Sequence, residues 1–597
     1  MKLTSQQNLA LRHKDGPILV LAGPGAGKTT MLLERINFLS ETVNSKHILT
    51  ITFSKAQAVD MKERYKSSKT NFMTIHAFCY LIIRNYLKIN NKNLRLLESD
   101  DLYNKYDLIS KIYFKINNKK ISKEDLNEFF GLTSYMKNAM IDESYLLDSK
   151  VKNCLQIYRA YENFKIRNFY IDFDDMQVIA LKLIENDPRL LRSIRNKYKY
   201  IQVDEGQDTS LIQFKIIEKI SAPFNNLMIV ADDDQSIYSF RAANVSYLLN
   251  LKNKYPNLKI VEMTENHRSS KNIVNLSKSF IDINKDRYPK DLFTQNDFDG
   301  KISIKSLRDV KDQYKFIIEN MNPGEKNAIL FRNNIQAVNI ISFLMEDEID
   351  FSVNISSLNF FESKIIDDLF NIIEFSDDFD RLDLFCEIYY KIGTFLKKKE
   401  VDRLSHKAIN KNVFEALYEL DLEDYKIETL IQKEKQLKHI RKLSLDKKIS
   451  YIYKYMDYKS YISNFSRKYR EEVVNKDLFI ESMVNFTKNL NTLEDFYNKK
   501  DKLEKKLSSS NSDLILSSIH KSKGLEYDNV FVINMVKNEF PILVDNEDLE
   551  NKIEEERRVM YVAMTRAKKN LHILSIKKRG SEKLSPSMFF TQIKDLL

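Results

Sequence analysis

Glycine is scarce in this sequence. It occurs 11 times in 597 residues, whereas average usage would give roughly 40. Collagen-like, low-complexity and turn-dense all-β chains need abundant glycine, so the composition excludes these three classes. Each glycine that does occur is therefore expected to serve a backbone conformation or a close approach that a side chain would prevent.

Cysteines and long apolar runs are also few. The three cysteines, Cys79, Cys154 and Cys386, form no CxxC pair and lack a fourth member for a zinc or iron–sulfur site. They are expected to be reduced, partly buried thiols. No stretch reaches the ~18 apolar residues of a membrane span, and the amino terminus, MKLTSQQNLALRHKDG, lacks the apolar core of a signal peptide. We therefore expect a cytoplasmic protein with no membrane partner.

The charge balance is basic. The chain has 95 lysines and arginines against 84 acidic residues, which gives a net charge of +11. This excess hints at a polyanionic partner without naming one. With 43% apolar residues, a chain of this length can form roughly three to five domains.

Short apolar runs predict two groups of buried parallel strands. Both groups are interrupted by a long, charged, helix-rich stretch, at about 85 to 195 and about 370 to 510. The first group comprises Ile18–Ala22, Ile48–Phe53, Tyr200–Val203, Leu227–Ala231 and Leu258–Met263, and the second comprises Ala328–Phe331, Leu514–Ile519, Val530–Ile533 and Leu571–Leu574.

The pattern predicts an α/β fold with two parallel-sheet domains, each carrying a mainly helical insertion. The first domain is expected at 1–85 and 196–270, with its insertion at 86–195. The second domain is expected at 271–370 and 510–597, with its insertion at 371–509.

The first predicted strand runs into the loop GPGAGKTT. Its glycines let successive backbone N–H groups curve around phosphate oxygens, and the following helix adds its positive end. Lys28 would reach the β- and γ-phosphates, and Thr29 would hold magnesium. A plain glycine turn before a helix is the alternative. The phosphate-binding interpretation uses Gly23, Gly25, Ala26, Gly27, Lys28, Thr29 and Thr30.

Two further strands end in polar residues. The string YIQVDEGQDTS places Asp204 as a magnesium partner and Glu205 as a candidate base at the carboxyl edge of the sheet. The string DDDQSIYSFRAA places Gln235 at the same edge, where it could touch the γ-phosphate, with Tyr238 and Phe240 beyond it to face a base. Such an arrangement could transmit the nucleotide state to a polymer.

Eight strings resemble the ordered motif series of superfamily 1 DNA helicases of the UvrD/Rep/PcrA type. They span the chain from Gln7 to Lys569. The resemblance implies two RecA-like P-loop domains with helical insertions, the second shorter than usual, and ATP and Mg²⁺ as cofactors. The strings are AGPGAGKTT, ITFSKAQAVDMKERY, TIHAFC, VDEGQDTS, VADDDQSIYSFRAA, ENHRSS, IHKSKGLEYDNVFV and EEERRVMYVAMTRAKK.

The resemblance also implies roles for single residues at the nucleotide. Gln7 matches the residue that reads the adenine edge, which suits an amide. Arg268 and Arg566 match two arginines that clamp the γ-phosphate. Since Arg566 belongs to the second domain, hydrolysis is expected to require closure of the cleft. Glu526 matches a residue near the ribose, and Gly524 lies beside it.

For the polymer, the resemblance implies single-stranded DNA and its junctions with duplex. Aromatic residues would stack bases, while hydroxyls and cations would hold phosphates. For two of these residues an alternative to DNA contact stays open: Phe53 could belong to the hydrophobic core, and His76 could be a structural histidine. The residues expected at DNA are Phe53, Thr74, His76, Tyr238, Phe240, Arg241, His520 and Lys523.

Several positions depart from the family pattern. Thr30 and His267 stand where the family has an arginine and a tyrosine that sandwich adenine, so nucleotide selectivity is expected to be looser. The string ISSLNFFESKII, from Ile355 to Ile366, keeps Phe361 and Glu362 but lacks the family's glycines.

The resemblance alone implies 3′-to-5′ movement. The sequence thus predicts an ATP-dependent helicase or translocase that couples hydrolysis to strand separation in DNA repair, recombination or replication. The alternative is a DNA-stimulated ATPase subunit that acts with a partner nuclease in repair or phage defence. RNA as a further substrate stays open.

Overall fold

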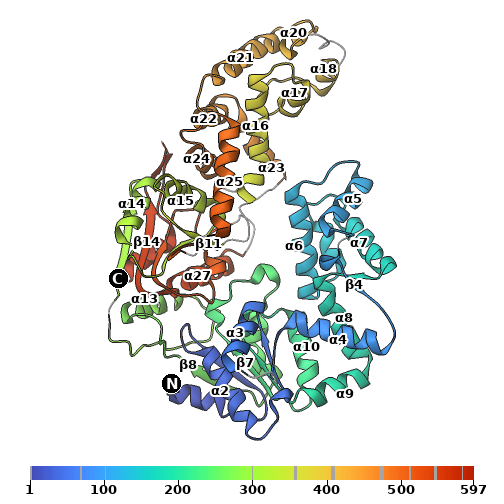
Figure 1. Ribbon diagram of the computed structural model, residues 1–597, viewed down its shortest axis with the longest axis vertical. Coiled ribbons are helices and arrows are strands. Elements are labelled where there is room, and N and C mark those ends of the chain that lie inside the picture. Colours follow the sequence, from blue (N-terminus) through green and yellow to red (C-terminus); the bar gives the residue numbers. More distant parts are fainter. Residues whose placement is uncertain are drawn as a thin grey trace. The chain divides into compact units, whose positions relative to one another are not determined.

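The structure is a computed structural model. It describes residues 3–66, 70–100, 102–298, 300–354, 359–404, 411–469, 476–509, 512–543, 548–580 and 582–597. The chain forms two compact units, Met1–Asp299 with Arg557–Tyr561 and Gly300–Glu556 with Val562–Leu597. Figure 1 shows the chain and labels many of the helices and strands of both units. No described helix is both long and apolar enough to cross a membrane.

The first unit is built on a six-stranded, all-parallel sheet with the strand order β3-β2-β6-β7-β1-β8. All side chains of β1, β2, β6 and β7 are buried, which explains their continuous apolar sequences. The strands are β1 (Ile18–Ala22), β2 (Ile48–Thr52), β3 (Asn71–Thr74), β6 (Tyr200–Val203), β7 (Leu227–Ala231) and β8 (Lys259–Met263).

Alternate residues of β1 enter two different cores, as the period of a strand requires. Leu19 and Leu21 belong to one cluster of buried residues, and Ile18 and Val20 to the other. Helices α4, α8 and α10 contribute to the first cluster, whereas α1, α2 and α3 contribute to the second. The helices outside the insertion are α1 (Ser5–Leu11), α2 (Lys28–Ser40), α3 (Lys55–Tyr65), α4 (Ile75–Ile89), α10 (Leu211–Ser221), α11 (Val245–Leu249), α12 (Leu251–Lys254) and α13 (Lys271–Ile281).

A helical segment is inserted between β3 and β6. Helices α5, α6 and α7 share a small core of their own, with Phe129 and Ile157 fully buried. Helix α8 packs on α4 and α10 and so joins the insertion to the sheet. The insertion comprises α5 (Lys105–Asn117), α6 (Lys123–Ala139), α7 (Cys154–Asn168), α8 (Phe173–Asn186), α9 (Pro188–Lys197) and the two-residue strands β4 (Arg95–Leu96) and β5 (Tyr170–Ile171).

The second unit contains another six-stranded parallel sheet, in the order β11-β12-β10-β13-β14-β9. Its strands are β9 (Ile302–Leu307), β10 (Asn327–Phe331), β11 (Ser352–Asn354), β12 (Leu514–Ser518), β13 (Tyr527–Val532) and β14 (Ala567–Ile576), and a small hairpin is formed by β15 (Lys578–Arg579) and β16 (Glu582–Lys583).

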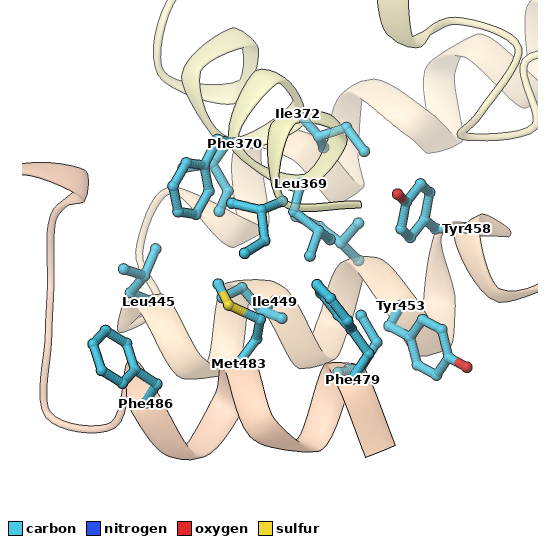
Figure 2. Packing of buried hydrophobic residues seen from close by; sticks show 14 of the residues in the cluster. Leu369, Phe370, Ile372, Leu445, Ile449, Tyr453, Tyr458, Phe479, Met483 and Phe486 are labelled. Carbon is cyan, nitrogen blue, oxygen red and sulfur yellow. The ribbon is translucent and has the colours of Figure 1, made fainter. Parts of the chain in front are cut away.

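The helices of the second unit continue its hydrophobic core beyond the sheet. Figure 2 shows apolar side chains of α16, α22 and α24 facing one another, with Tyr458 of α23 beside them. Phe361 packs against Phe486 and Phe496 in the same core. The helices are α14 (Val310–Asn320), α15 (Asn334–Glu346), α16 (Lys364–Asp377), α17 (Leu382–Ile388), α18 (Lys398–Asp402), α20 (Val413–Tyr418), α21 (Asp424–Ile440), α22 (Leu445–Tyr455), α23 (Tyr458–Tyr469), α24 (Lys476–Phe486), α25 (Leu493–Ser509), α26 (Ile519–Ser522), α27 (Leu549–Met564) and α28 (Met588–Asp595).

The predicted α/β fold and the two groups of parallel strands are confirmed. All nine predicted strands are present, with ends that shift by up to a few residues. Strands β3, β9 and β11 were not predicted. Cys79 and Cys154 are buried, but the prediction of a partly buried thiol is wrong for Cys386, which is exposed. Residues 355–358 of the string ISSLNFFESKII lie outside the described residues.

Candidate functional site

The loop between β1 and α2 has two left-handed glycines, Gly25 and Gly27, directly before a helix. Gly27 is the N-cap of α2 and adopts the left-handed conformation, with φ of 76°. A Cβ there would lie 2.6 Å from Nε2 of Gln7, so a side chain would be excluded by strain and by space. Helix α2 begins at Lys28, so its free N–H groups face the loop.

Gln7 holds this loop from α1. Its Nε2 donates to the carbonyl oxygen of Ala26 at 3.0 Å, and the side chain is buried. Thr4 caps α1 by accepting a hydrogen bond from the N–H of Gln7, while the N–H of Thr4 donates to Oε1 of Gln7. The residue expected to read adenine therefore also fixes the phosphate loop.

Lys28 and Glu205 lie together. Nζ of Lys28 is 3.7 Å from Oε1 of Glu205, and both side chains are largely shielded from solvent. The two residues come from different strand ends, those of β1 and β6, on the same sheet. The structure thus unites the expected phosphate ligand and the expected base, as the carboxyl edge of a parallel sheet should.

Asp204 is buried beside this pair. Its Oδ1 accepts a hydrogen bond of 3.0 Å from the N–H of Glu205. Burial, followed by the Glu205 carboxylate, raises the pKa of Asp204 to about 7. A nearby cation would counter both effects. A carboxylate and the hydroxyl of Thr29 are oxygen donors of the kind that Mg²⁺ prefers, so these residues fit that ion.

A chain of hydrogen bonds connects Glu205 to Gln235, and its middle members were not predicted. Nε2 of Gln207 donates to Glu205, and Oε1 of Gln207 accepts from the N–H of Asp232 at 3.0 Å. Asp232 in turn accepts from Nε2 of Gln235. Hydrogen bonds therefore join Glu205 to Gln235 through Gln207 and Asp232.

Gly206 allows the segment after β6, VDEGQDTS, to lie against strand β7. A Cβ on Gly206 would come within 2.4 Å of Cγ2 of Ile229 on β7. Only a bare backbone fits there, which gives a physical reason for this glycine in a chain that has few.

The three aspartates after β7 are held by two cations that the sequence did not reveal. Nζ of Lys290 lies 3.3 Å from Asp232 and 2.9 Å from Asp234, and it also contacts Asp233. Arg287 forms two hydrogen bonds of 2.8 Å with Asp234. Burial opposes the charge of Lys290, but the three carboxylates outweigh it and raise the pKa of Lys290. The cluster therefore fixes the segment that carries Gln235.

Arg268 lies against the phosphate loop. A Cβ on Gly25 would be 2.8 Å from Cβ of Arg268. Asn266, a further residue that was not predicted, accepts at Oδ1 from the N–H of Arg268 at 2.8 Å and donates from Nδ2 to the carbonyl oxygen of Pro24 at 2.7 Å. Asn266 thus ties the backbone of Arg268 to the loop.

The two positions that depart from the family pattern also border the loop. The N–H of His267 donates to the carbonyl oxygen of Gly25 at 3.1 Å. Nη2 of Arg64, on α3, donates to Oγ1 of Thr30 at 3.4 Å. An arginine from α3 therefore stands beside Thr30, although Thr30 itself carries no charge.

An aromatic row continues from the Gln235 segment. The rings of Phe53 and Tyr238 stack with centroids 5.0 Å apart, and Tyr238 meets Phe240 edge-on at 5.9 Å. The guanidinium of Arg241 lies over both Tyr238 and Phe240. Phe53 is 37% exposed and Phe240 is 60% exposed, so Phe53 is not a core residue. Exposed rings with a cation suit stacked bases and phosphates.

Thr74 and His76 lie at the start of α4. Oγ1 of Thr74 caps the helix by accepting from the N–H of Ala77 at 3.2 Å. His76 is only partly exposed, and burial lowers the pKa of its imidazole. Nε2 of His76 lies 3.2 Å from Nε2 of Gln177 on α8.

The expected residues of the second unit lie around β12, β13 and α27. His520 lies on α26 and Lys523 caps it, while Glu526 pairs with Lys568 at 2.6 Å. Gly524 adopts a φ of 83°. Arg566 is buried, and its guanidinium donates to the carbonyl oxygens of Val562 and Leu525 and to the hydroxyl of Thr565.

Comparisons with known proteins identify the family that the eight sequence strings resemble. A family model for the UvrD/REP helicase N-terminal domain matches residues 3–256, and one for the UvrD-like helicase C-terminal domain matches residues 261–578. The ATP-dependent DNA helicase PcrA of Staphylococcus epidermidis is 28% identical over 656 aligned positions, which cover 100% of this chain and 87% of the relative. A probable DNA helicase II homolog of Mycoplasma capricolum is 29% identical, over 100% of this chain and 88% of the relative.

Proposed function

Since the chain belongs to the UvrD/REP helicase family and is an ATP-dependent DNA helicase, we propose that it moves 3′ to 5′ along single-stranded DNA. It would separate strands in repair, recombination or replication. The chain would contain two RecA-like domains, at 1–85 with 196–270 and at 271–370 with 510–597, and each would carry one helical insertion, at 86–195 and at 371–509. The observation that carries the coupling of hydrolysis to DNA is a series of side-chain contacts from Lys28 and Glu205 to Gln235. Gln235 stands three residues before Tyr238, whose ring meets the exposed ring of Phe240. The direction rests on the family resemblance.

Binding of ATP would change the partner of Lys28. In the structure its ammonium faces Glu205 at 3.7 Å. The β- and γ-phosphates carry more negative charge than one carboxylate and would draw Lys28 away. Glu205 would then accept the proton of the attacking water. Lys28 therefore acts as a charge switch that frees the base when substrate arrives.

Magnesium would be held by Thr29 and Asp204. When bound, the ion supplies positive charge that offsets the charge of the phosphates. Asp204 must be ionised to bind it, and burial raises the pKa of Asp204, so a cation nearby would favour the ionised form. The protein's own contribution is to hold the Asp204 carboxylate through the N–H of Glu205.

Arg268 would stabilise the negative charge on the transferred phosphoryl group, and Arg566 would do so from the second unit. Arg268 already lies against the loop. Arg566 would exchange its carbonyl partners for phosphate oxygens, which are better acceptors for a guanidinium. Gln7, His267, Gly524 and Glu526 would bind the rest of the nucleotide.

Loss of the γ-phosphate would change the position of Gln235 and, through it, the contacts with DNA. Gln235 and Tyr238 are three residues apart, and Tyr238 stacks on Phe53. A shift of Gln235 would therefore move the rings on which bases stack. Thr74, His76, Arg241, His520 and Lys523 are proposed to hold the phosphates of the same strand.

Strand separation on tailed duplexes tests the direction. The isolated full chain is expected to release the strand of a duplex with a 3′ single-stranded tail, given ATP and Mg²⁺, and to leave a 5′-tailed or blunt duplex intact. The measurement is a gel or fluorescence assay at modest salt, because phosphate contacts weaken as salt rises.

The opposite preference would contradict the proposed direction. ATP hydrolysis stimulated by DNA without strand separation on any substrate would instead favour an ATPase subunit that acts with a partner nuclease. Parallel duplexes with RNA tails would decide whether RNA is also a track.

A further inference from the structure

A chain of buried amide groups runs through the first unit from His76 to Ser210. Nε2 of Gln177 lies 3.2 Å from Nε2 of His76 and donates to Oδ1 of Asn138 at 3.1 Å. Oγ of Ser210 donates to the same Oδ1 at 3.2 Å. Gln177, Asn138 and Ser210 are all buried. Hydrogen bonds thus connect three buried polar side chains, two from the insertion and one from the sheet domain.

The acceptors around Asn138 fix which way the amides point. Nδ2 of Asn138 lies 3.0 Å from both the carbonyl oxygen of Ser134 and Oδ1 of Asp174. Neither group can donate, so the NH₂ of Asn138 must face them and its Oδ1 must face Gln177. Gln177 therefore has to present its own NH₂ to Oδ1 of Asn138.

The orientation of Gln177 fixes the tautomer of His76. The NH₂ group that serves Asn138 also faces Nε2 of His76, so that ring nitrogen must accept a hydrogen bond. An imidazole that accepts at Nε2 carries its proton on Nδ1 and is neutral. Burial, opposed by Asp174, lowers the pKa of His76 and favours the same neutral form. Oε1 of Gln177 has no hydrogen-bond partner among the described residues. The contacts of its NH₂ group with His76 and Asn138 therefore determine how the Gln177 amide is oriented.

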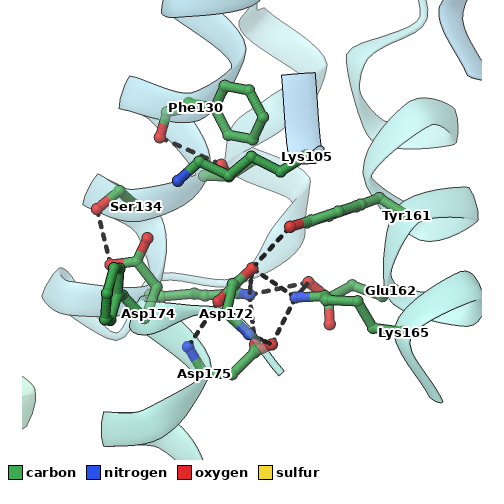
Figure 3. Close-up of polar contacts among 12 residues, drawn as sticks. Lys105, Phe130, Ser134, Tyr161, Glu162, Lys165, Asp172, Asp174 and Asp175 are labelled. Carbon is green, nitrogen blue, oxygen red and sulfur yellow. Dashed lines mark hydrogen bonds and ion pairs between the residues drawn. The ribbon is translucent and has the colours of Figure 1, made fainter. Parts of the chain in front are cut away.

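An ion-pair cluster on α6, α7 and α8 keeps Asn138 in place. Lys137, the neighbour of Asn138, contacts Glu162 at 2.8 Å and Asp175 at 2.7 Å. Lys165 contacts Asp172 at 2.7 Å and Asp175 at 2.6 Å. Figure 3 shows the Lys165 side chain reaching in among the carboxylates of Glu162, Asp172 and Asp175. Glu162, Asp172 and Asp175 are therefore neutralised by Lys137 and Lys165, and these ion pairs connect α6, α7 and the start of α8.

The other end of the chain of amides lies between two functional strings. Ser210 is the N-cap of α10 and follows Glu205 by five residues. It also forms an isolated antiparallel bridge with Ala243, two residues after Arg241. The carbonyl oxygen of the adjacent Thr209 accepts from the N–H of Asn244 at 3.1 Å. Ser210 thus connects the string VDEGQDTS, which contains Glu205, to the segment that carries Tyr238 and Phe240.

We propose that Gln177 and Asn138 are positioning residues for DNA-stimulated hydrolysis. They hold His76 as the neutral tautomer that carries its proton on Nδ1, which leaves that N–H to donate to a phosphate oxygen of the strand. They also tie His76 to Ser210, so that strand binding at His76 biases the string that carries Glu205. The inference rests on the proposed function, because it needs a DNA strand at His76.

Gln177→Met tests this role in the full chain. Methionine keeps the length and volume of the side chain but cannot donate. The DNA concentration that gives half-maximal stimulation of ATP hydrolysis is expected to rise about 10-fold, because His76 loses the hydrogen bond that fixes its tautomer and the loss of one buried hydrogen bond changes an equilibrium by roughly that factor. The unstimulated rate and the KM for ATP should not change. Gln156→Met, an exposed position on α7 of the same insertion, is the matched control.

A purely structural role would lower the stimulated and unstimulated rates together, and that result would overturn the proposal. An unchanged half-stimulating DNA concentration would also overturn it. If the wild-type chain were not stimulated by DNA at all, the proposed function would fail first, which separates the two failures.

The tautomer can be measured without any substitution at Gln177. Long-range ¹H–¹⁵N spectra of histidine-labelled wild-type protein, with His76→Asn to assign the signal among eight histidines, should show His76 neutral with its proton on Nδ1. A signal from the other tautomer, or from a charged ring at neutral pH, would contradict the proposal even if Gln177→Met failed to fold.

Discussion

Glu205→Gln is expected to lower the DNA-stimulated rate of ATP hydrolysis by about 10²–10⁴-fold, the usual contribution of a positioned general base. Glutamine keeps the shape of the side chain but cannot accept a proton from water. Binding of single-stranded DNA should be largely retained, because the exposed rings of Phe53 and Phe240 are untouched. The measurements are phosphate release with saturating DNA and fluorescence anisotropy of a labelled strand.

Glu34→Gln is the matched control for this change. Glu34 lies on α2, the helix that begins at Lys28, but it is exposed and accepts a hydrogen bond from Nδ2 of Asn37. It should hydrolyse ATP at the wild-type rate. Normal turnover by Glu205→Gln would mean that another group activates the water, and the assignment of the base would be wrong.

Arg268→Ala is expected to reduce turnover by about 10³–10⁵-fold, the range observed when an arginine that stabilises the phosphoryl group is absent. Asn266 holds the backbone N–H of residue 268, not its side chain. The alanine variant should therefore keep the loop and still bind ATP. Single-turnover hydrolysis with protein in excess separates this loss of chemistry from any loss of affinity.

Arg268→Lys serves as the conservative variant and Arg189→Ala as the matched surface control. Lysine keeps the charge but not the planar fork, so only a small part of the activity should return. Arg189 is an exposed residue of α9, and its alanine variant should behave as wild type. A turnover of Arg268→Ala close to that of Arg189→Ala would remove Arg268 from the site.

The central strands could be predicted because both of their faces are buried. Strands such as β1 and β7 have no solvent face, so their sequences are continuous apolar runs. Strand β3, with the sequence NFMT, and strand β11, with SVN, are edge strands whose side chains are all only partly buried. Strand β9 is also an edge strand and is buried at only one position. Such strands leave no comparable run in the sequence.

The parts of the site that follow strand ends could also be predicted. The loop before Lys28 and the string around Glu205 each lie within a few consecutive residues, and the parallel sheet brings them together. Lys290 and Asn266 could not be found in the same way. Lys290 meets Asp232 across 58 positions of sequence, and a single lysine in a charged segment carries no signal of that contact. Gln207 lay inside a recognised string, but its role depends on the N–H of Asp232.

The central claim is that hydrolysis between Lys28 and Glu205 drives directed movement along single-stranded DNA. Stopped-flow translocation on strands of increasing length, with a fluorophore at one end, tests it most directly. With ATP and Mg²⁺, we expect the delay before the signal from a 5′ label to grow in proportion to strand length, with no such delay at a 3′ label. A delay independent of length at both ends, or one that grows only at the 3′ label, would contradict the account.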